Sequence, residues 1–400
     1  MSFIAERINR IKPSMTVGIN NKANALRAQG KDILVLAAGE PDFDTPENIR
    51  KAANQAIEEG KTRYVPGKGT PALQKAIQSK FIKDNGIHYD LDEIMVGVGG
   101  KHIIYNAMMA TINPGDEVII PAPFWVSYPD IVLLAEGNPI IVQCSQDQNF
   151  KITPEQLEEN INERTKWLML NSPSNPTGVL YTKEELKNLS KILLKYPNVL
   201  IMSDDIYEKI IYDDKKFFTI AEVEPQLINR TLTLNGVSKA YCMTGWRLGY
   251  AGGPEELINA MNKIQSQSTT STSSISMAAA VEALNGDQSF ILKHNVEFKK
   301  RRDMVVQMLN SAEGITCDTP NGAFYVYPSC KGCIGKETPN GHKISTDEEF
   351  MNYLLDSEGI AGVHGAAFGM SPFFRISYAT SKDILFDACN RIIKACKNLK

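Results

Sequence analysis

The sequence lacks any long hydrophobic run, so nothing in it predicts a membrane-spanning helix. None of its apolar stretches approaches the roughly 20 residues that a bilayer requires. The first residues, MSFIAERINRIKPS, carry charges where a secretion signal needs an apolar centre. An excess of one charge is also missing, because 43 Lys and Arg residues stand against 46 Asp and Glu residues. We therefore expect no binding to nucleic acid or to a membrane surface, and any anion must bind at a local site.

Cysteine is sparse and irregularly spaced. The seven cysteines form an odd set without the spacing of a disulfide framework, which favours reduced thiols in a cytoplasmic protein. Cys330 and Cys333 have the C-x-x-C spacing of a metal or redox site, but no second pair stands at zinc-site spacing. We expect a turn with two free thiols there, and no metal site.

Short β-rich runs alternate with amphipathic helical patterns through the middle of the chain. Several runs are apolar without strict alternation, as strands covered on both faces should be. This alternation predicts an α/β protein with a doubly wound, mostly parallel sheet, whose ligand crevice lies beyond the carboxyl ends of the strands. The candidate strands are residues 94–98, 117–120, 139–143, 167–170, 199–203, 231–234 and 248–251.

The chain changes character at about residue 287, and its 400 residues are too many for one ordinary compact domain. A long helical stretch is followed by a patch rich in Gly, Pro and Cys at residues 327–342, and short strands are expected at 324–327 and 373–377. We predict a large domain at residues 46–286 and a smaller α+β domain at residues 287–400. Residues 1–45 would be an arm that also forms part of the smaller domain.

The chemically richest segment is NGVSKAYCMTGWRLGY, residues 235–250, which follows the strand predicted at residues 231–234. Lys239 therefore lies just beyond a strand end, where a partly dehydrated amine loses some preference for its charged form. Such an amine can form a Schiff base with a carbonyl group. Arg247 follows in the same loop and has the planar fork that suits a phosphate. A lone loop lysine is usually a solvated charge, but the Ser, Thr, Gly, Trp and Arg residues around this one favour a function.

Four more predicted strands are followed by segments that could face the same crevice. Asp204 comes first after residues 199–203, although it and Asp205 could equally cap a turn. GVGGK, residues 97–101, could bring backbone N–H groups to a phosphate, although a plain strand-to-helix turn explains it too. Asn175 in NSPSNPTG and Trp125 in PAPFW could contact an aromatic ring. If each segment is considered by itself, Asn175 is more simply explained as a turn residue and Trp125 as a core residue.

Together these segments resemble the fold-type I, class I pyridoxal-phosphate aminotransferases, and particularly their bacterial aspartate aminotransferase branch. The resemblance covers essentially the whole chain, from GEPDFDTP at residues 39–46 to FRISYA at residues 374–379. Its most specific part is the combination of SK…MTGWR with NPTG. It implies that residues 46–286 bind the cofactor, pyridoxal 5'-phosphate, and that two copies of the chain form a homodimer with shared active sites.

The resemblance also implies roles for individual residues. Lys239 would hold the cofactor and move the substrate proton, Asp204 would pair with the ring nitrogen, and Arg375 would bind the substrate α-carboxylate. Tyr207 and Asn175 would contact the ring oxygen, and Trp125 would stack on the ring face. Gly100, Lys101 and Arg247 would hold the phosphate region, and Tyr64 would reach the phosphate of a neighbouring subunit. Gly39, Trp125 and Asn175 would also contact the substrate.

The implied reaction is an exchange of an amino group between amino acids and 2-oxo acids, in two half-reactions. The branch implies L-aspartate and 2-oxoglutarate, so a second cation should meet the side-chain carboxylate of the substrate. Lys101 is one candidate, and Lys12 is another, because a basic residue in this N-terminal segment accompanies the use of prephenate in some relatives. The segment TSTSSISM, residues 270–277, departs from the Asn-Pro and Gln of many relatives. It bears on the contact with the partner subunit and on specificity.

Three alternatives remain at this stage. A β-eliminating lyase of the same fold would share Lys239 and Asp204 but would release pyruvate without a 2-oxo acid acceptor. A non-catalytic regulator would usually add a DNA-binding domain, and the chain has no basic N-terminal extension for one. A nucleotide-binding oxidoreductase would need a complete glycine fingerprint, but His102 stands where the third Gly would fall.

Overall fold

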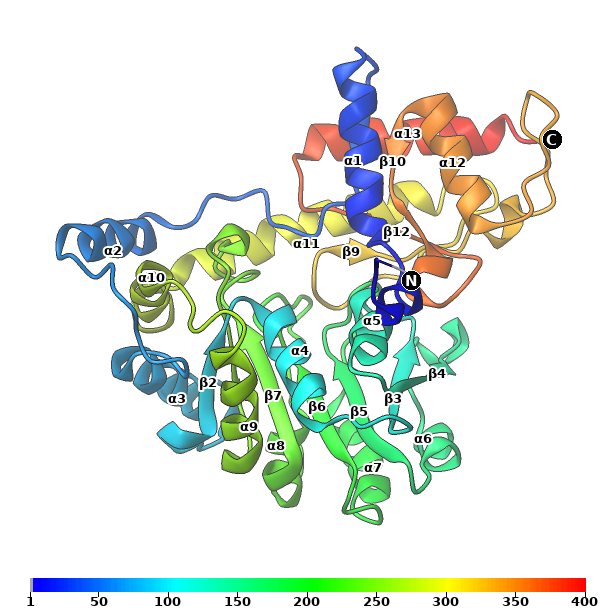
Figure 1. Ribbon diagram of the computed structural model, residues 1–400. Helices are drawn as coiled ribbons and strands as arrows, with labels where there is room; N and C mark the ends of the chain where they lie inside the picture. Colours follow the sequence, from blue (N-terminus) through cyan, green and yellow to red (C-terminus); the bar gives the residue numbers. More distant parts are fainter. Residues whose placement is uncertain (1–2) are drawn as a thin grey trace.

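A seven-stranded sheet forms the centre of the larger part of the molecule (Figure 1). The structure is a computed structural model and describes residues 3–400. The strand order is β2-β8-β7-β6-β5-β3-β4, and β8 alone runs antiparallel to its neighbours. The strands are β2 (Ile94–Gly97), β3 (Glu117–Ala122), β4 (Asn138–Gln143), β5 (Thr165–Asn171), β6 (Leu200–Asp204), β7 (Thr231–Gly236) and β8 (Gly249–Gly252).

Side chains on both faces of this sheet are buried, which explains why its strands are apolar without alternating. In β5, Trp167 and Met169 pack into one core cluster, whereas Leu168 and Leu170 pack into another on the opposite face. The first cluster takes in residues of α4 (Gly100–Thr111), α5 (Ser127–Leu134) and α9 (Glu255–Ser266), and the second those of α6 (Pro154–Asn160) and α7 (Lys183–Leu193). Packing on both faces therefore holds the sheet in place, and with it the side chains at the ends of its strands.

Two helices in this part start at capping boxes. Thr182 and Glu185 make a reciprocal capping box at the start of α7, and Thr153 and Gln156 do the same at α6. Two further helices, α2 (Glu47–Glu58) and α10 (Ser274–Asn285), pack on each other at the side of the sheet near α3 (Pro71–Asn85) (Figure 1). The short helix α8 (Ile220–Val223) completes this part.

The C-terminal part packs around a small antiparallel sheet. Its strands are β11 (Val363–His364), β12 (Phe374–Ser377) and β9 (Tyr325–Val326), in that order. The strand β1 (Leu34–Val35) pairs in parallel with β10 (Ile360–Ala361), so the start of the chain joins this part. The helices are α1 (Met15–Ala28), α11 (Ser289–Leu309), α12 (Asp347–Glu358) and α13 (Lys382–Lys397), of which α11 runs across toward α10 (Figure 1).

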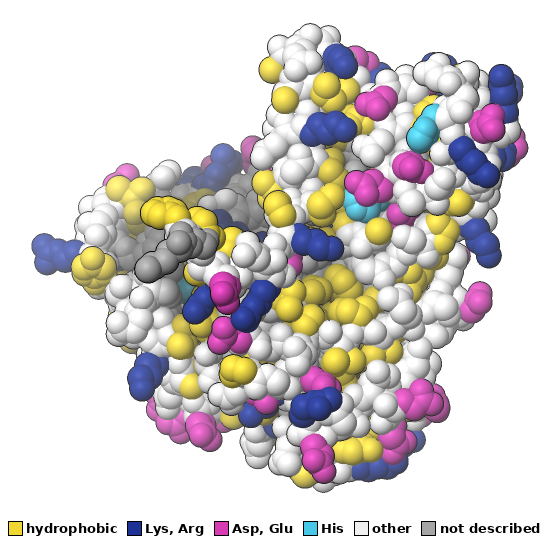
Figure 2. Space-filling model, turned by 45° about the vertical axis from the view of Figure 1, so that its right-hand side comes forward, with side chains coloured by type: hydrophobic (Ala, Val, Ile, Leu, Met, Phe, Trp, Pro, Cys, Tyr) yellow, Lys and Arg dark blue, Asp and Glu magenta, His cyan; other side chains and the backbone are white. Residues whose placement is uncertain are grey.

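The α/β fold and the mostly parallel sheet are confirmed, and each of the seven expected strands is present with ends that differ by one or two residues. Sequence patterns could not show that residues 249–252 run antiparallel, because that depends on pairing with β2 and β7. All seven cysteines are free thiols and buried. No helix within residues 3–400 is long and apolar enough to cross a membrane. Figure 2 shows basic and acidic side chains intermixed over one face of the molecule.

Candidate active site

A cavity of about 420 Å³ lies at the carboxyl ends of the parallel strands and reaches the C-terminal part of the chain. Segments that follow β2, β3, β5, β6 and β7 all contribute side chains to it, as expected for a doubly wound sheet. Ten of the residues singled out from the sequence line it: Gly39, Gly100, Lys101, Trp125, Asn175, Asp204, Tyr207, Lys239, Arg247 and Arg375.

Lys239 lies three residues beyond β7 and points into the cavity. Its Nζ donates a hydrogen bond to the carbonyl oxygen of Gly39 at 2.5 Å and lies 5.7 Å from the ring centre of Tyr207. Burial lowers the pKa of Lys239 to about 8, and the nearby charge of Arg375 acts in the same direction. A substantial fraction of the amine is therefore neutral near physiological pH, as a nucleophile or a proton acceptor must be.

Asp204 is the last residue of β6 and places a buried carboxylate at the floor of the cavity. Its Oδ2 accepts a hydrogen bond of 2.6 Å from the hydroxyl of Tyr128, and its Oδ1 accepts one of 3.3 Å from the N–H of Ile206. Burial raises the pKa of Asp204 to about 6, while the Tyr128 hydrogen bond opposes this rise. Asp205 does not line the cavity and instead accepts a hydrogen bond from Ser203.

Arg375 on β12 presents a buried guanidinium to the other side of the cavity. It donates to Asn175 Oδ1 at 2.8 Å and to the carbonyl oxygen of Ala37 at 2.7 Å, while its Nε has no partner among the described residues. The rings of Tyr325 and Phe368 lie 4.6 and 5.0 Å from the guanidinium carbon. A buried cation whose partners are neutral has a strong preference for an added carboxylate.

A third cationic group lies at the N-terminal end of α4. Gly99 has a φ of 83°, and a Cβ atom there would meet the guanidinium of Arg247, so only glycine lets the two approach. Arg247 donates to the carbonyl oxygen of Thr244 at 2.8 Å. Lys101 Nζ lies 4.9 Å from the ring centre of Trp125, and desolvation followed by the charge of Arg247 lowers the pKa of Lys101. Free N–H groups and two cations can hold a phosphate here.

Two of the predicted residues lie outside this cavity. Tyr64 is 91% exposed and borders a different hollow of about 540 Å³ between α2 and α10, which Ser274 of the atypical segment also lines. The backbone N–H of Lys12 donates to Asp130 at 3.4 Å, and the side chain of Lys12 does not line the cavity. The chain segment that follows Lys12 does lie over the cavity, because Ser14 lines it.

Sequence reasoning missed several side chains of this cavity. Tyr128 has no motif around it and is recognised only by its hydrogen bond to Asp204. Tyr325, whose hydroxyl lies 2.8 Å from that of Tyr207, comes from the C-terminal part, and no sequence spacing brings the two together. Asn20 of α1 lines the cavity with a buried Oδ1 that has no partner among residues 3–400.

We expect Tyr128→Phe to lower kcat at neutral pH by about 2- to 10-fold, the range for one net hydrogen bond. Loss of the hydroxyl removes a hydrogen bond that favours the ionised form of Asp204, so the carboxylate takes up its proton at a higher pH. The acidic limb of the profile of kcat/KM against pH should therefore move to higher pH. An unshifted profile with reduced activity would assign Tyr128 a purely structural role.

Comparison with known proteins gives a consistent result. Residues 31–392 match the family described as aminotransferase class I and II. The chain is 56% identical over 396 residues to a probable aspartate/prephenate aminotransferase of Rhizobium leguminosarum bv. phaseoli, covering 99% of both chains. It is 56% identical over 399 residues to an aspartate/prephenate aminotransferase of Cereibacter sphaeroides, covering 100% of both.

Solved structures give the same picture. The aspartate aminotransferase from Rhizobium meliloti superposes with a TM-score of 0.98, is 52% identical and is matched over 100% of both chains. The aspartate aminotransferase from Thermus thermophilus with maleate has a TM-score of 0.92 and is 39% identical, over 99% of this chain and 100% of that one.

Proposed function

The chain belongs to the class I and II aminotransferase family, and from this we propose that it exchanges an amino group between L-aspartate and 2-oxoglutarate, with pyridoxal 5'-phosphate as cofactor. The single observation that carries the proposal is the convergence of Lys239, Asp204 and Arg375 on one cavity. It brings together a depressed-pKa amine, a buried carboxylate and a buried guanidinium that lacks an acidic partner.

The residues of the cavity fit this cofactor. Its phosphate suits the start of α4, where Gly99 leaves room for Arg247, and its protonated ring nitrogen suits the carboxylate of Asp204. Trp125 and Tyr207 border the space between these two ends. When bound, the cofactor supplies an electron sink for the bond that breaks at the substrate α-carbon.

The chain's own groups would then divide the work. Arg375 binds the α-carboxylate through its planar fork and fixes the orientation of the α-carbon. The neutral amine of Lys239 would take the proton from the substrate α-carbon and deliver it to the cofactor carbon that carries the amino group away, which its lowered pKa permits near neutral pH. Asp204, held by Tyr128, keeps a negative charge beside the ring nitrogen. The cavity walls keep water away from the amine.

Specificity for a dicarboxylic substrate would come from Lys101. Its ammonium group lies over Trp125 at the mouth of the cavity, on the same side as Arg247. The relatives named above act on aspartate, some of them also on prephenate, and both compounds carry two carboxylates. We propose aspartate as the amino donor of this chain and 2-oxoglutarate and prephenate as its acceptors, with Lys12 as the residue to examine for prephenate.

Lys101→Ser should lower kcat/KM for aspartate by about 10- to 100-fold, the loss of one hydrogen bond to a charged group, and change phenylalanine much less. The measurement is a panel of amino donors against 2-oxoglutarate, repeated with prephenate as acceptor. The matched control is Lys75→Ala, because Lys75 is an exposed lysine of α3 that lies away from the cavity. Equal losses for both donors would remove Lys101 from this role.

Three broader features belong to the same proposal. The exposed Tyr64 and the hollow between α2 and α10 favour a homodimer in which each subunit completes its partner's site.

The proposed division of the chain into residues 1–45, 46–286 and 287–400 is supported by the separation of its strands into a large central sheet and smaller sheets near the C-terminus. Seven free thiols suit the reducing cytoplasm.

A further inference from the structure

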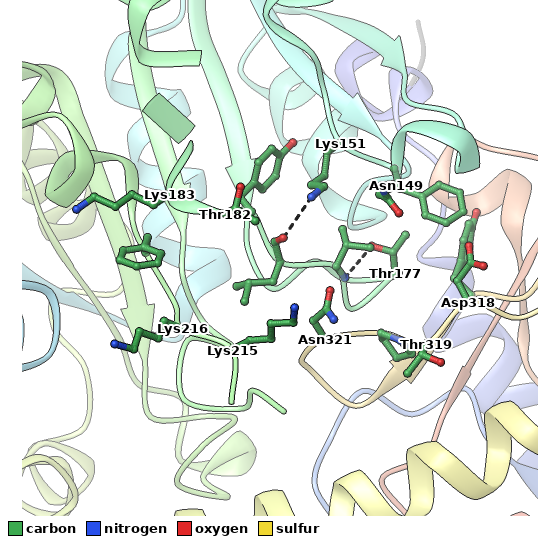
Figure 3. Close-up of a pocket in the computed structure, with 17 residues that line it drawn as sticks. Asn149, Lys151, Thr177, Thr182, Lys183, Lys215, Lys216, Asp318, Thr319 and Asn321 are labelled. Carbon is green, nitrogen blue, oxygen red and sulfur yellow. Dashed lines mark hydrogen bonds between the residues drawn. The ribbon is translucent and has the colours of Figure 1, made fainter. Parts of the chain in front are cut away.

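A second cavity, of about 340 Å³, shares no lining residue with the candidate active site and is rich in lysine. Figure 3 shows its lining side chains. They come from residues 149–151, the turn that follows β5, the start of α7, two loops around residues 215–218 and 318–321, and Tyr327. The lysines are Lys151, Lys183, Lys215 and Lys216, whereas Asp318 is the acidic residue of the lining. The function proposed above makes no use of this cavity.

The positive charge of this cavity is only partly neutralised. Lys151 pairs with Glu185 at 2.5 Å. The carboxylate of Asp318, which accepts a hydrogen bond from the neutral amide of Gln146, offsets one further positive charge. Lys215 Nζ has no hydrogen bond or ion pair among the described residues, and Figure 3 shows its side chain reaching toward Asn321. Lys183 and Lys216 extend away from Asn321. They therefore add to the positive electrostatic potential of the cavity without contacting a ligand bound near Asn321. The cavity centre is therefore a site where an anion gains charge stabilisation.

Neutral donors and apolar walls complete the lining. The side-chain amides of Asn149 and Asn321 and the hydroxyl of Thr319 have no hydrogen-bond partner within the part of the chain that the structure describes. Apolar surface is supplied by Phe150, Val179, Leu180, Phe218, Pro320 and others. A ligand that fits has an anionic head and a small organic body.

We propose that this cavity binds a small phosphate-bearing anion, either free phosphate or a phosphate monoester, and that its occupancy adjusts substrate binding. Lysine binds phosphate as a point charge, and the cavity is lined by lysine without arginine, so recognition here depends on accumulated charge, which a multiply charged phosphate group uses best. Its volume accommodates a phosphorylated compound of a few carbon atoms.

The link to the active site runs through the turn at residues 171–178. The backbone N–H groups of Asn321 and Gly322 both donate to the carbonyl oxygen of Gly178, at 3.1 and 2.9 Å. Gly178 has a φ of 69°, and a Cβ there would meet Gly322 and Pro320, so turn and loop are in tight contact. Asn175 in this turn accepts the hydrogen bond of Arg375, so an anion held by Asn321 and Lys215 biases the position of both residues.

The test is calorimetric titration of the cofactor-loaded enzyme with inorganic phosphate and, in a second arm, with glycerol 3-phosphate at constant ionic strength. Lys215→Ala should weaken binding at least about tenfold, whereas Lys215→Arg retains it and Lys75→Ala changes it less than about twofold. Tighter binding of glycerol 3-phosphate than of inorganic phosphate identifies a phosphate monoester as the ligand. Equal affinities for the two compounds identify phosphate itself. Because Lys215 is exposed, its replacement leaves the core intact.

Absence of saturable binding, or an equal loss in Lys75→Ala, would overturn the site. The coupling rests on the proposed function and is measured separately, as a change in KM for aspartate at saturating ligand that Lys215→Ala removes. Binding with an unchanged KM would overturn the coupling. The binding arm needs no turnover, so its failure is distinct from a failure of the proposed reaction.

Discussion

Lys239→Ala is expected to abolish transamination, with a fall in turnover of at least about 10³-fold, because the variant lacks the group that moves the α-proton. The same substitution should remove the visible absorbance that accompanies a covalent link between cofactor and lysine. Lys239 lines the cavity, and its Nζ lies 2.5 Å from the carbonyl oxygen of Gly39. Borohydride reduction of the parent enzyme, followed by peptide mapping, should label Lys239.

Controls separate this effect from misfolding. Lys239→Arg keeps a positive charge but has no nucleophilic amine, and it should be equally inactive, whereas Lys75→Ala should behave as the parent. Retained turnover in Lys239→Ala, or a label on another lysine, would contradict the assignment.

Stability against pH offers a second readout for the cofactor-free protein. The pKa of Lys239 is about 8 in the folded chain, whereas an ordinary solvent-exposed lysine has a pKa of 10.5, so between these values the unfolded chain binds more protons. The free energy of unfolding therefore gains a component that rises with pH over this window. Lys239→Ala should lack that component.

Asp204→Asn is expected to lower kcat by about 10²–10³-fold, because it replaces the buried charge beside the ring nitrogen by a neutral group of the same shape. Tyr128 can still donate to the new amide oxygen, so the local packing is preserved. The covalent link to Lys239 should still form, and the visible absorbance should remain while turnover falls. Steady-state kinetics and absorbance on the same sample measure both.

The neighbouring residue provides a matched control. Asp205 is equally buried, but it does not line the cavity and accepts a hydrogen bond from Ser203, so Asp205→Asn leaves the carboxylate of Asp204 in place. We expect near-parent kcat for this variant. Equal losses in the two variants would show that Asp204 acts by packing rather than by charge.

Much of the site could be predicted because the sheet is regular. A parallel strand covered on both faces leaves a clear apolar run, and whatever follows it must face the crevice, which is how Asp204, Lys239 and Asn175 were found. Tyr128 and Tyr325 could not be found in this way. Each acts through one side-chain hydrogen bond across the fold, and such contacts leave no local pattern. The lysine-rich cavity is also invisible in the sequence, because its walls come from separate loops.

The reversed strand β8 has a mechanical consequence for cofactor retention. Gly236 at the end of β7 pairs with Gly249 at the start of β8, so the loop between them leaves and re-enters the sheet at one edge. That loop carries both Lys239 and Arg247. The amine proposed to bind the cofactor covalently and the guanidinium proposed to bind its phosphate thus belong to one hairpin. A movement of the C-terminal part of the chain would therefore leave the distance between these two groups unchanged.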